Sequence, residues 1–423
     1  MTILSYNSTH YRRNFPICEY KKADKILLEE EKEGKMTSIL IFIIYLAFIS
    51  LGLPDSLLGL AWPVIHTNIS VPLSYSGIVF MIISFGTVVS SLNSDRLIRK
   101  IGTGKVTAFS TLTTVIALMG FSFSRNFISM CFWAIPYGLG AGSIDAALNN
   151  YVALHYASRH MSWLHCMWGV GATIGPVIMS FALTSSHDWH LGYRYVGLIQ
   201  FALMTVLFLS LPLWKERKQD PERSGVSLSL SEVLRIKGVI EMMVTFFCYC
   251  ALEQSTGLWA SSWLVNCKGI DPDTAARFAS LFFTGITLGR AISGFITFRF
   301  NDRQMVHLGF AIICCGLFCL LQSLSDKVCL IGLVLIGLGC APVYPSLIHS
   351  VPERFGQDNS QAVIGVQMAS AYVGTSLMAP LFGVIVKMID ISAFPFYLIL
   401  ILAIMVIFHE ILIRGTDKEK TGN

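Results

Sequence analysis

The chain has 423 residues, of which 54% are hydrophobic and only 13% are charged. Soluble domains carry about 25% charged residues, so this composition excludes an ordinary soluble protein. The formal net charge of +5 is explained by the basic loops described below and calls for no nucleic-acid partner. Apolar runs of about 20 residues recur along the chain, and each is long enough to cross the hydrocarbon core of a bilayer. We therefore predict an all-α polytopic membrane protein.

Residues 1–36 form a polar segment that lacks the apolar core of a signal peptide. One interpretation is a cytoplasmic tail. The other is that the natural start is Met36, because the codons of "EEEKEGK", directly before it, are purine-rich like those of a ribosome-binding site.

Twelve apolar spans follow, and the longest polar break, residues 215–238, divides them six and six. We predict an N-terminal bundle at 37–214, a cytoplasmic linker at 215–238, a C-terminal bundle at 239–414 and a cytoplasmic tail at 415–423. The predicted spans are 38–64, 74–94, 105–124, 127–155, 161–184, 192–213, 239–265, 274–297, 304–324, 327–350, 361–388 and 393–413.

The short loops predict the orientation, because cytoplasmic loops carry an excess of Lys and Arg. With both termini in the cytoplasm, far more of these residues fall on the inner side than on the outer side. We expect a multi-pass protein of the cell membrane with this orientation.

The two halves of the chain resemble each other at one constant offset. The segment Leu53–Ser56 aligns with Leu252–Ser255, Gly86 with Gly285, and Gly138–Ala141 with Gly337–Cys340. The same offset places Asp145 over Tyr344. Parallel six-helix repeats related by an axis along the membrane normal are the plan of the major facilitator superfamily, which this sequence therefore resembles.

The loop after the second span strengthens the resemblance. Its sequence "SLNSDRLIRKIGTGK" is similar to the superfamily's loop of glycine, Asp-Arg, glycine and basic residues, with Ser91 and Ile98 in place of the two glycines. The resemblance implies that Asp95, Arg96 and Arg99 latch the cytoplasmic side through charge-assisted contacts. The alternative is a loop that is charged only to fix the orientation.

Asp145 lies inside an apolar span, where a charge costs about 2.5–3.5 kcal/mol on insertion scales. On a helix, Gly138, Gly142, Asp145 and Asn149 share one stripe. Such an acid is expected to face a polar cavity, and the alternative is a hydrogen bond between helices. A second acid, Asp55, lies in the first span. We therefore predict a cavity with paired acids.

A narrower resemblance is to the fucose–proton symporters, which carry an Asn-Asp pair in the first helix and Glu-x-x-x-Asn in the fourth. Here "LPDS" has Pro54 in place of that asparagine, and "IDAALNN" has Asp145 in place of the glutamate. The resemblance implies alternating-access transport of a small polar solute, a sugar, coupled to protons or sodium. It implies Asp55 as the proton site and Asp145 as a substrate hydrogen bond, or the reverse. Glu253 is a third acid of the proton-coupling set.

Sugar recognition needs amides for hydroxyl groups and aromatic faces for C–H surfaces. Aromatic side chains in membrane spans also pack or face lipid, so each remains a candidate. His165 is a candidate proton relay or a helix-packing hydrogen bond, and His349 is expected near the cytoplasmic end. The substrate candidates are Asn149, Asn150, Gln254, Gln367, Trp62, Trp168, Trp259, Tyr344 and Tyr372.

Other functions remain open. The motifs do not fix the direction of transport, so export of a sugar, drug or metabolite is the alternative. A non-transporting sensor would need a signalling domain that these residues do not supply. We expect no enzyme, cofactor or metal site, since the sequence has no nucleotide loop, no HExxH, no nucleophile motif and no cysteine–histidine pairing with metal-ligand spacing. We expect a monomer in the lipid bilayer.

Overall fold

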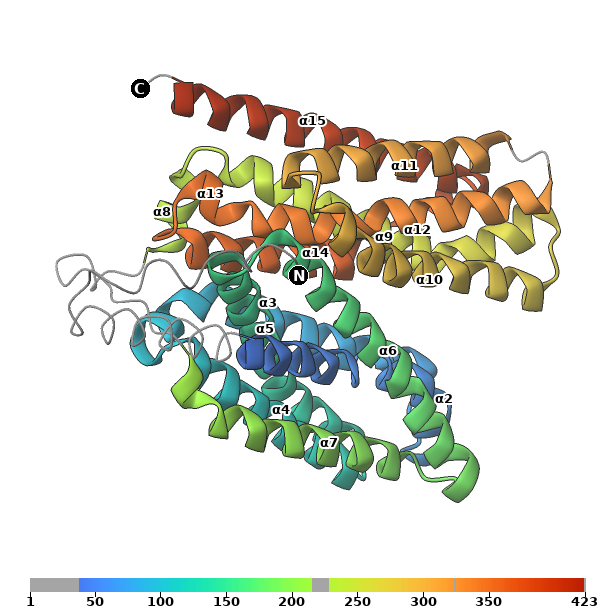
Figure 1. Cartoon of the computed structure of the whole chain (residues 1–423). Coiled ribbons are helices and arrows are strands. Elements are labelled where there is room, and N and C mark those ends of the chain that lie inside the picture. The colour runs from blue at the N-terminus through green and yellow to red at the C-terminus, as the bar shows by residue number, and fades with distance from the viewer. Residues whose placement is uncertain (1–37, 215–227, 323–324, 422–423) are drawn as a thin grey trace, which may run out of the picture.

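The computed structural model describes residues 38–214, 228–322 and 325–421, and it is helical almost throughout (Figure 1). No strand occurs in these three segments. The predicted N-terminal tail, including the question of Met36, and the first part of the predicted linker lie outside the described residues.

Six membrane-spanning segments make up the first group of helices, which we call the N-bundle. They are helix 38–52 continued by α2 (Leu57–Asn68), α3 (Ser76–Ile101), α4 (Thr103–Phe123), α5 (Phe127–His155), α6 (Ser158–Ser186) and α7 (Trp189–Leu209), with short 3-10 turns at Leu73–Tyr75 and Leu211–Leu213.

The second group, the C-bundle, contains six more long helices. They are α9 (Val239–Lys268), α10 (Pro272–Ile296), α11 (Asp302–Gln322), α12 (Asp326–His349), α14 (Ser360–Met388) and α15 (Phe394–Thr421), accompanied by the short helices α8 (Leu230–Arg235), α13 (Val351–Phe355) and a 3-10 turn at Ile391–Ala393. Helix α8 lies inside the predicted linker, and α15 continues through residues predicted as tail.

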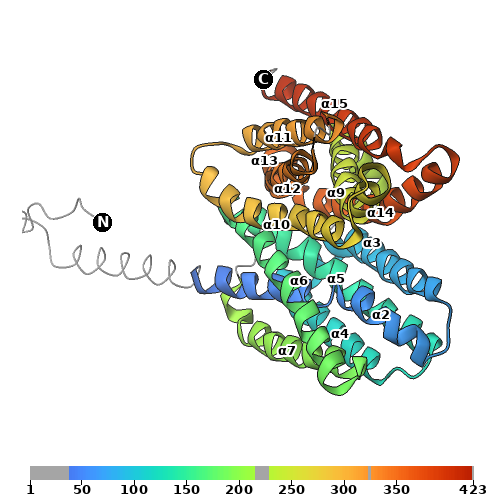
Figure 2. The ribbon, with the colours of Figure 1, turned by 90° about the vertical axis from the view of Figure 1, so that its right-hand side faces the viewer.

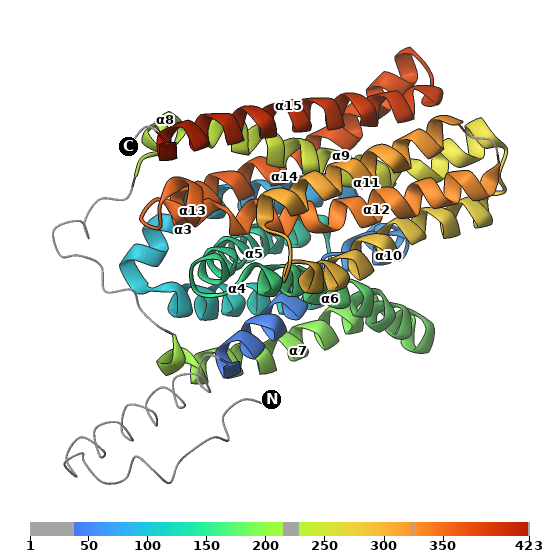
Figure 3. The ribbon, with the colours of Figure 1, turned by 45° about the horizontal axis from the view of Figure 1, so that its top comes forward.

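The twelve-helix prediction is confirmed. Eleven segments of the described chain are long and apolar enough to cross a membrane. Helix α9 is the twelfth long helix: it has 30 residues and packs beside α14 and α15. Figure 3 shows α15 on the outside of the C-bundle, along α11 and α9.

The internal repeat is visible in how the helices cross. In the N-bundle, a Cβ added at Gly86 of α3 would lie 3.2 Å from the main chain of Gly138 in α5. In the C-bundle, a Cβ at Gly285 of α10 would lie 3.4 Å from the main chain of Gly337 in α12. The aligned glycines therefore make the same helix crossing in each bundle, as expected for two copies of one unit.

Pro54 interrupts the first membrane segment. Helix 38–52 ends before it, residues 53–56 form turns, and α2 begins at Leu57. A proline inside a helix removes one hydrogen bond and clashes with the carbonyl of the preceding turn, so the helix breaks here. The break places Asp55 within the membrane-spanning segment rather than at its end. Membrane transporters commonly build binding sites at such breaks.

Two glycines of α6 bring that helix against the broken segment. A Cβ at Gly171 would collide with the main-chain carbonyl of Ile49, and one at Gly175 with that of Leu53. Only glycine permits this approach. Because Trp168 lies one turn before Gly171, the same contact carries its ring to the break at Asp55.

The two bundles meet at one end of the molecule. We call this the linker end, because it holds α13 and also α8, which lies inside the predicted linker (Figure 1). There α3 lies against α14 and α6 against α10 (Figure 2). Toward the opposite end, which we call the far end, the bundles diverge (Figure 1). The structure is therefore closed at the linker end.

Candidate functional site

Asp55 is held at the helix break by two aromatic donors. The indole N–H of Trp168 donates to Oδ2 across 2.8 Å, and the Tyr137 hydroxyl donates to Oδ1 across 3.4 Å. The side chain is nevertheless exposed. An acid that is positioned and also exposed can exchange protons and contact a solute.

Asp145 is buried and joins the two bundles. Its Oδ1 accepts a hydrogen bond from Asn149 Nδ2 across 2.8 Å, one turn away on α5. Its Oδ2 accepts one from the Tyr372 hydroxyl of α14 across 2.7 Å. The carboxylate therefore has one donor from each bundle, and a change in its charge acts on the contact between them.

His165 of α6 extends this network. Its Nε2 lies 3.0 Å from Asn149 Oδ1. Because the Asn149 amide nitrogen donates to Asp145, its oxygen is the acceptor here and His165 Nε2 must carry a proton. The ring of His165 also meets Tyr344 of α12 edge-on, with centroids 4.6 Å apart. The relay interpretation and the packing interpretation of His165 both fit this position.

Arg290 of α10 is a site residue that the sequence reasoning missed. It is buried, with 3% of its surface exposed, and its Nη2 lies 3.6 Å from Oε2 of Glu253 in α9. The guanidinium lies over the rings of Trp168 and Tyr344, 5.7 and 5.8 Å from their centroids. The available signal was an arginine well inside the apolar span 274–297, by the argument already used for Asp145.

Together these contacts form one continuous group, which we call the central cluster. Asp55 touches Trp168, whose ring lies beneath Arg290, and Arg290 pairs with Glu253. On the other side, Tyr344 leads through His165 and Asn149 to Asp145. The members of the central cluster are Asp55, Tyr137, Asp145, Asn149, His165, Trp168, Glu253, Arg290, Tyr344 and Tyr372.

Other predicted substrate residues lie in different surroundings. The Trp259 indole donates to the Ala379 carbonyl across 2.8 Å, and the Trp62 indole donates to the Leu73 carbonyl across 2.7 Å, each within one bundle. Asn150 accepts a hydrogen bond from Ser360 at the linker end. Gln254 is exposed on α9, and Gln367 is fully buried in α14. No contact described here joins these five residues to the central cluster.

The predicted stripe on α5 contacts three neighbouring helices. Its glycine part packs on α3, since a Cβ at Gly138 or Gly142 would strike the carbonyls of Ile83 or Thr87. Its polar part, Asp145 and Asn149, turns to α14 and α6 instead. The small residues thus serve packing within the N-bundle, and the polar residues serve contacts to the cluster.

The predicted latch residues lie at the linker end. Arg99 Nε donates to both oxygens of Asp95, each at 2.9 Å, and its Nη2 donates to the Asp358 carbonyl of the C-bundle across 2.8 Å. Nearby, Gln361 Nε2 donates to Ser94 Oγ across 3.0 Å. Arg96 is exposed. Asp95 therefore orients Arg99, which makes the contact between the two bundles.

Comparisons with known proteins agree with this architecture. The family model described as Major Facilitator Superfamily matches residues 44–321 and 242–423. The overlap of the two matches is consistent with a repeated unit.

Several curated proteins and solved structures are similar to the chain. Bypass of stop codon protein 6 of Saccharomyces cerevisiae is 23% identical over 82% of this chain and 77% of its own length. The glucose/mannose transporter GlcP of Bacillus subtilis is 22% identical over 69% of this chain and 75% of its own. The Escherichia coli fucose:proton symporter FucP superposes with a TM-score of 0.74 at 15% identity, covering 88% of this chain and 98% of that one. Another FucP structure, in the outward conformation, gives a TM-score of 0.72.

Proposed function

We propose that this chain, which belongs to the major facilitator superfamily of membrane transporters, moves a small polar solute, a sugar, together with protons by alternating access. Family membership makes it a transporter rather than an enzyme. The sugar and the proton are our inference. It is supported by the similarity to GlcP and FucP and, above all, by the central cluster.

The observation that carries the proposal is the arrangement of the two acids. Asp55 lies exposed at a helix break, and Asp145 lies buried at a hydrogen bond between the bundles. An exposed acid can take up a proton. The buried acid accepts one hydrogen bond from each bundle, so a change in its charge changes the strength of the contact between them. In this arrangement Asp55 is the proton site, and Asp145 couples substrate binding to the movement of the bundles.

Recognition of a sugar follows from the side chains around the acids. Trp168 and Tyr344 offer aromatic faces. Asn149 is fully buried with its amide bonded to Asp145 and His165, so it would contact a sugar by exchanging one of these hydrogen bonds. Arg290 neutralises Glu253, which places an ion pair rather than a lone charge in the membrane. A proton on Glu253 would therefore leave the positive charge of Arg290 uncompensated and change the net charge of the central cluster. Gln254, on the next position of α9, remains a proposed contact because it is exposed.

The transport step uses the hydrogen bond between Asp145 and Tyr372. When Asp145 is ionised, this bond is charge-assisted and holds α5 against α14. When a substrate hydroxyl or a proton takes up one of the carboxylate oxygens, that link weakens. Because the bundles are also latched by Arg99 at the linker end, release requires both contacts to open.

The structure is closed at the linker end, and we propose that this end is cytoplasmic. The predicted excess of basic loops lies on that side. The protein would then be an outward-facing monomer of the cell membrane, with both termini in the cytoplasm and two transport bundles at 37–214 and 239–414.

Uptake into proteoliposomes tests the proposal. The purified protein is reconstituted, an inward proton gradient is imposed, and accumulation of radiolabelled glucose, mannose, fucose and xylose is measured. We expect accumulation of at least one sugar that collapses when the gradient is dissipated. Accumulation of none of them, with drug efflux instead, would favour the exporter.

A further inference from the structure

A second cluster of polar side chains lies at the linker end, apart from the central cluster. His349 ends α12 and Asp302 begins α11, both in the C-bundle. They face Tyr156, which follows α5, and Ser158, which begins α6, both in the N-bundle. We call these four residues the gate cluster, because each of its N-bundle members contacts a C-bundle member.

The contacts of the gate cluster cross between the bundles. Ser158 Oγ donates to Asp302 Oδ1. His349 Nδ1 lies 2.6 Å from Asp302 Oδ2, and His349 Nε2 lies 3.0 Å from the Tyr156 carbonyl oxygen. The side chains of His349 and Asp302 are only 19% and 13% exposed. The cluster is therefore largely buried, and the contacts that Ser158 and Tyr156 make with it exist only while the linker end is closed.

The donors and acceptors of the cluster do not balance for a neutral histidine. A carboxylate and a main-chain carbonyl are both acceptors, and a neutral imidazole has a single N–H. If Asp302 is ionised and His349 is neutral, one ring nitrogen carries no proton. The lone pair of that nitrogen then points at the lone pair of an oxygen, which is repulsive. Both contacts become hydrogen bonds when one more proton is present, as an imidazolium at His349 or as a carboxylic acid at Asp302.

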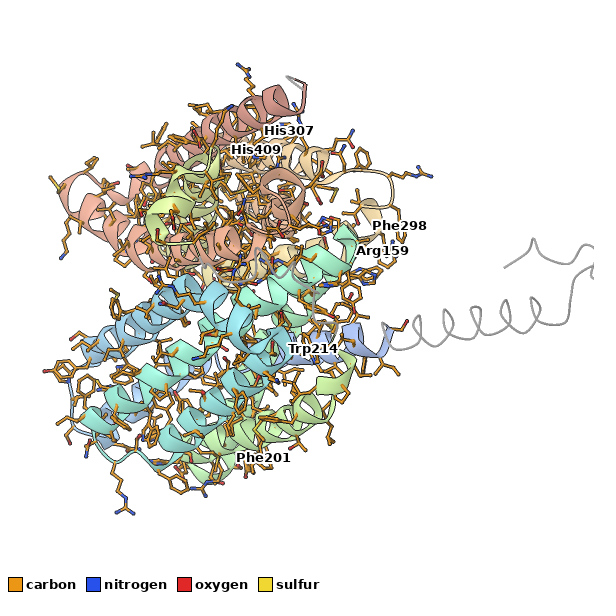
Figure 4. All side chains as sticks on the ribbon, turned by 90° about the vertical axis from the view of Figure 1, so that its left-hand side faces the viewer. Arg159, Phe201, Trp214, Phe298, His307 and His409 are labelled. Carbon is orange, nitrogen blue, oxygen red and sulfur yellow. The ribbon has the colours of Figure 1, made fainter. Side chains whose placement is uncertain are left out.

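The charged groups around His349 agree with an added proton. Two acids act on it, Asp302 of α11 and Glu353 of α13. Three basic residues lie close in sequence to members of the cluster. Arg159 of α6 lies over the ring of Phe298, 5.1 Å from its centroid, Arg354 of α13 donates to Thr416 Oγ1 across 3.4 Å, and the Arg303 side chain is exposed. Figure 4, viewed onto the linker end, shows Arg159 and Phe298 at the junction of the two bundles.

We propose that the gate cluster is a second proton-binding site, formed by both bundles, which takes its proton from the water at the linker end and locks that end closed. The bound proton is lost when the bundles separate, because His349 then leaves the Tyr156 carbonyl. The site is separate from the acids of the central cluster and does not require that the substrate be a sugar.

The sign of the pH effect follows from linkage. A proton bound in the closed form and released in the open form makes the closed form less populated as pH rises. One such proton changes the ratio of closed to open molecules by up to about tenfold per pH unit. On the proposed orientation, an alkaline cytoplasm would favour opening toward it.

Distance measurements across the gate test the proposal. Spin-labelled non-natural amino acids are placed at the exposed positions Lys100 of the N-bundle and Arg299 of the C-bundle, and the protein is studied in nanodiscs without substrate from pH 5 to 9. The background carries Asp55→Asn and Asp145→Asn to remove the titration of these two central acids, while Glu253 keeps its ion pair with Arg290 in every variant. We expect the closed fraction to fall as pH rises, and His349→Gln to flatten that dependence.

His307 supplies a matched control. Its Nε2 also lies 2.6 Å from a carboxylate oxygen of the C-bundle, Glu410 Oε1, whereas the His349 ring makes a second contact, with the Tyr156 carbonyl of the N-bundle. Figure 4 shows His307 beside His409, away from the junction of the bundles. His307→Gln should keep the pH dependence of the parent. An unchanged pH dependence in His349→Gln would overturn the proposal.

If the His349 variant fails to fold, a spectroscopic measurement on the parent protein tests whether the gate cluster holds the extra proton. The parent is labelled with ¹⁵N-histidine, and its ring nitrogens are observed by solid-state NMR at pH 6, where the gate is closed. We expect a His349 ring with hydrogen-bonded protons on both nitrogens, or a neutral ring whose Nδ1 accepts a proton from Asp302. A ring nitrogen that is neither protonated nor hydrogen-bonded would exclude the site.

Discussion

Trp168 donates its indole N–H to the carboxylate of Asp55 across 2.8 Å, and so ties α6 to the break in the first membrane segment. The relationship depends on Pro54, which creates the break, and on Gly171 and Gly175, which let α6 approach it. Substitutions of Trp168 therefore test whether the position of Asp55 matters for coupling.

Trp168→Phe keeps an aromatic face but removes the indole donor. A hydrogen bond to a charged group contributes about 1.5–3 kcal/mol, and the exposure of Asp55 places this one at the lower end. We expect proton-driven accumulation to fall roughly tenfold, with unfolding little changed. The matched control is Trp259→Phe, which loses a bond to the Ala379 carbonyl inside the C-bundle and should leave accumulation intact. Equal accumulation in both variants would show that Trp168 does not position Asp55.

Tyr372→Phe removes the hydroxyl that links α14 to Asp145. We expect weaker cohesion between the bundles and a changed apparent KM for the transported sugar, because the carboxylate loses its donor from the C-bundle. Initial uptake rates at several sugar concentrations measure this. The comparison is Tyr397→Phe, which removes a hydroxyl bonded to the Met378 carbonyl across 2.8 Å within the C-bundle. A KM that shifts only in Tyr397→Phe would contradict the assigned role.

Arg290 and Glu253 should depend on each other. Removing one partner of a buried ion pair costs about 3–5 kcal/mol, and the partial exposure of Glu253 favours the lower value. We expect Arg290→Met to lower the thermal stability in detergent strongly, and Arg290→Met with Glu253→Gln to recover much of the loss. Purely additive losses in this double-mutant cycle would mean that the pair is not coupled.

The crossing glycines test the repeat. Gly138→Ala and Gly337→Ala each place a Cβ against a main-chain carbonyl, that of Ile83 or of Phe282. We expect both to destabilise by about 1–3 kcal/mol through overpacking, measured as thermal unfolding. Gly77→Ala has open space around its Cβ and should be neutral or slightly stabilising. If the two bundles responded very differently, the crossings would not be equivalent.

The sequence predicted the fold well because the length of an apolar run is a local property that needs no partner. The constant offset between halves predicted the repeat for the same reason. The acids Asp55 and Asp145 could also be predicted, since a charge in an apolar run stands out wherever it packs. Their partners could not: Tyr372 lies 227 residues from Asp145, and only the closed packing of the bundles brings the two together.

Arg290 and the gate cluster show two other limits. Arg290, like Asp145, is a charged residue inside an apolar span, but only the acids in such spans were considered as site residues. His349 and Asp302 each fall near a helix end, where charged residues are ordinary, so nothing in the sequence distinguishes them from solvated residues. Their significance arises from the Tyr156 carbonyl of the other bundle, which is a tertiary contact.

The central claim is that Asp55 carries the proton that drives uptake. The measurement is accumulation of labelled sugar by proteoliposomes under an inward proton gradient, alongside exchange of internal for external sugar without a gradient. Asn cannot release a proton, so we predict that Asp55→Asn abolishes accumulation and retains exchange. Accumulation by Asp55→Asn equal to that of the parent would contradict the account and move the coupling site to Asp145, Glu253 or a sodium ion.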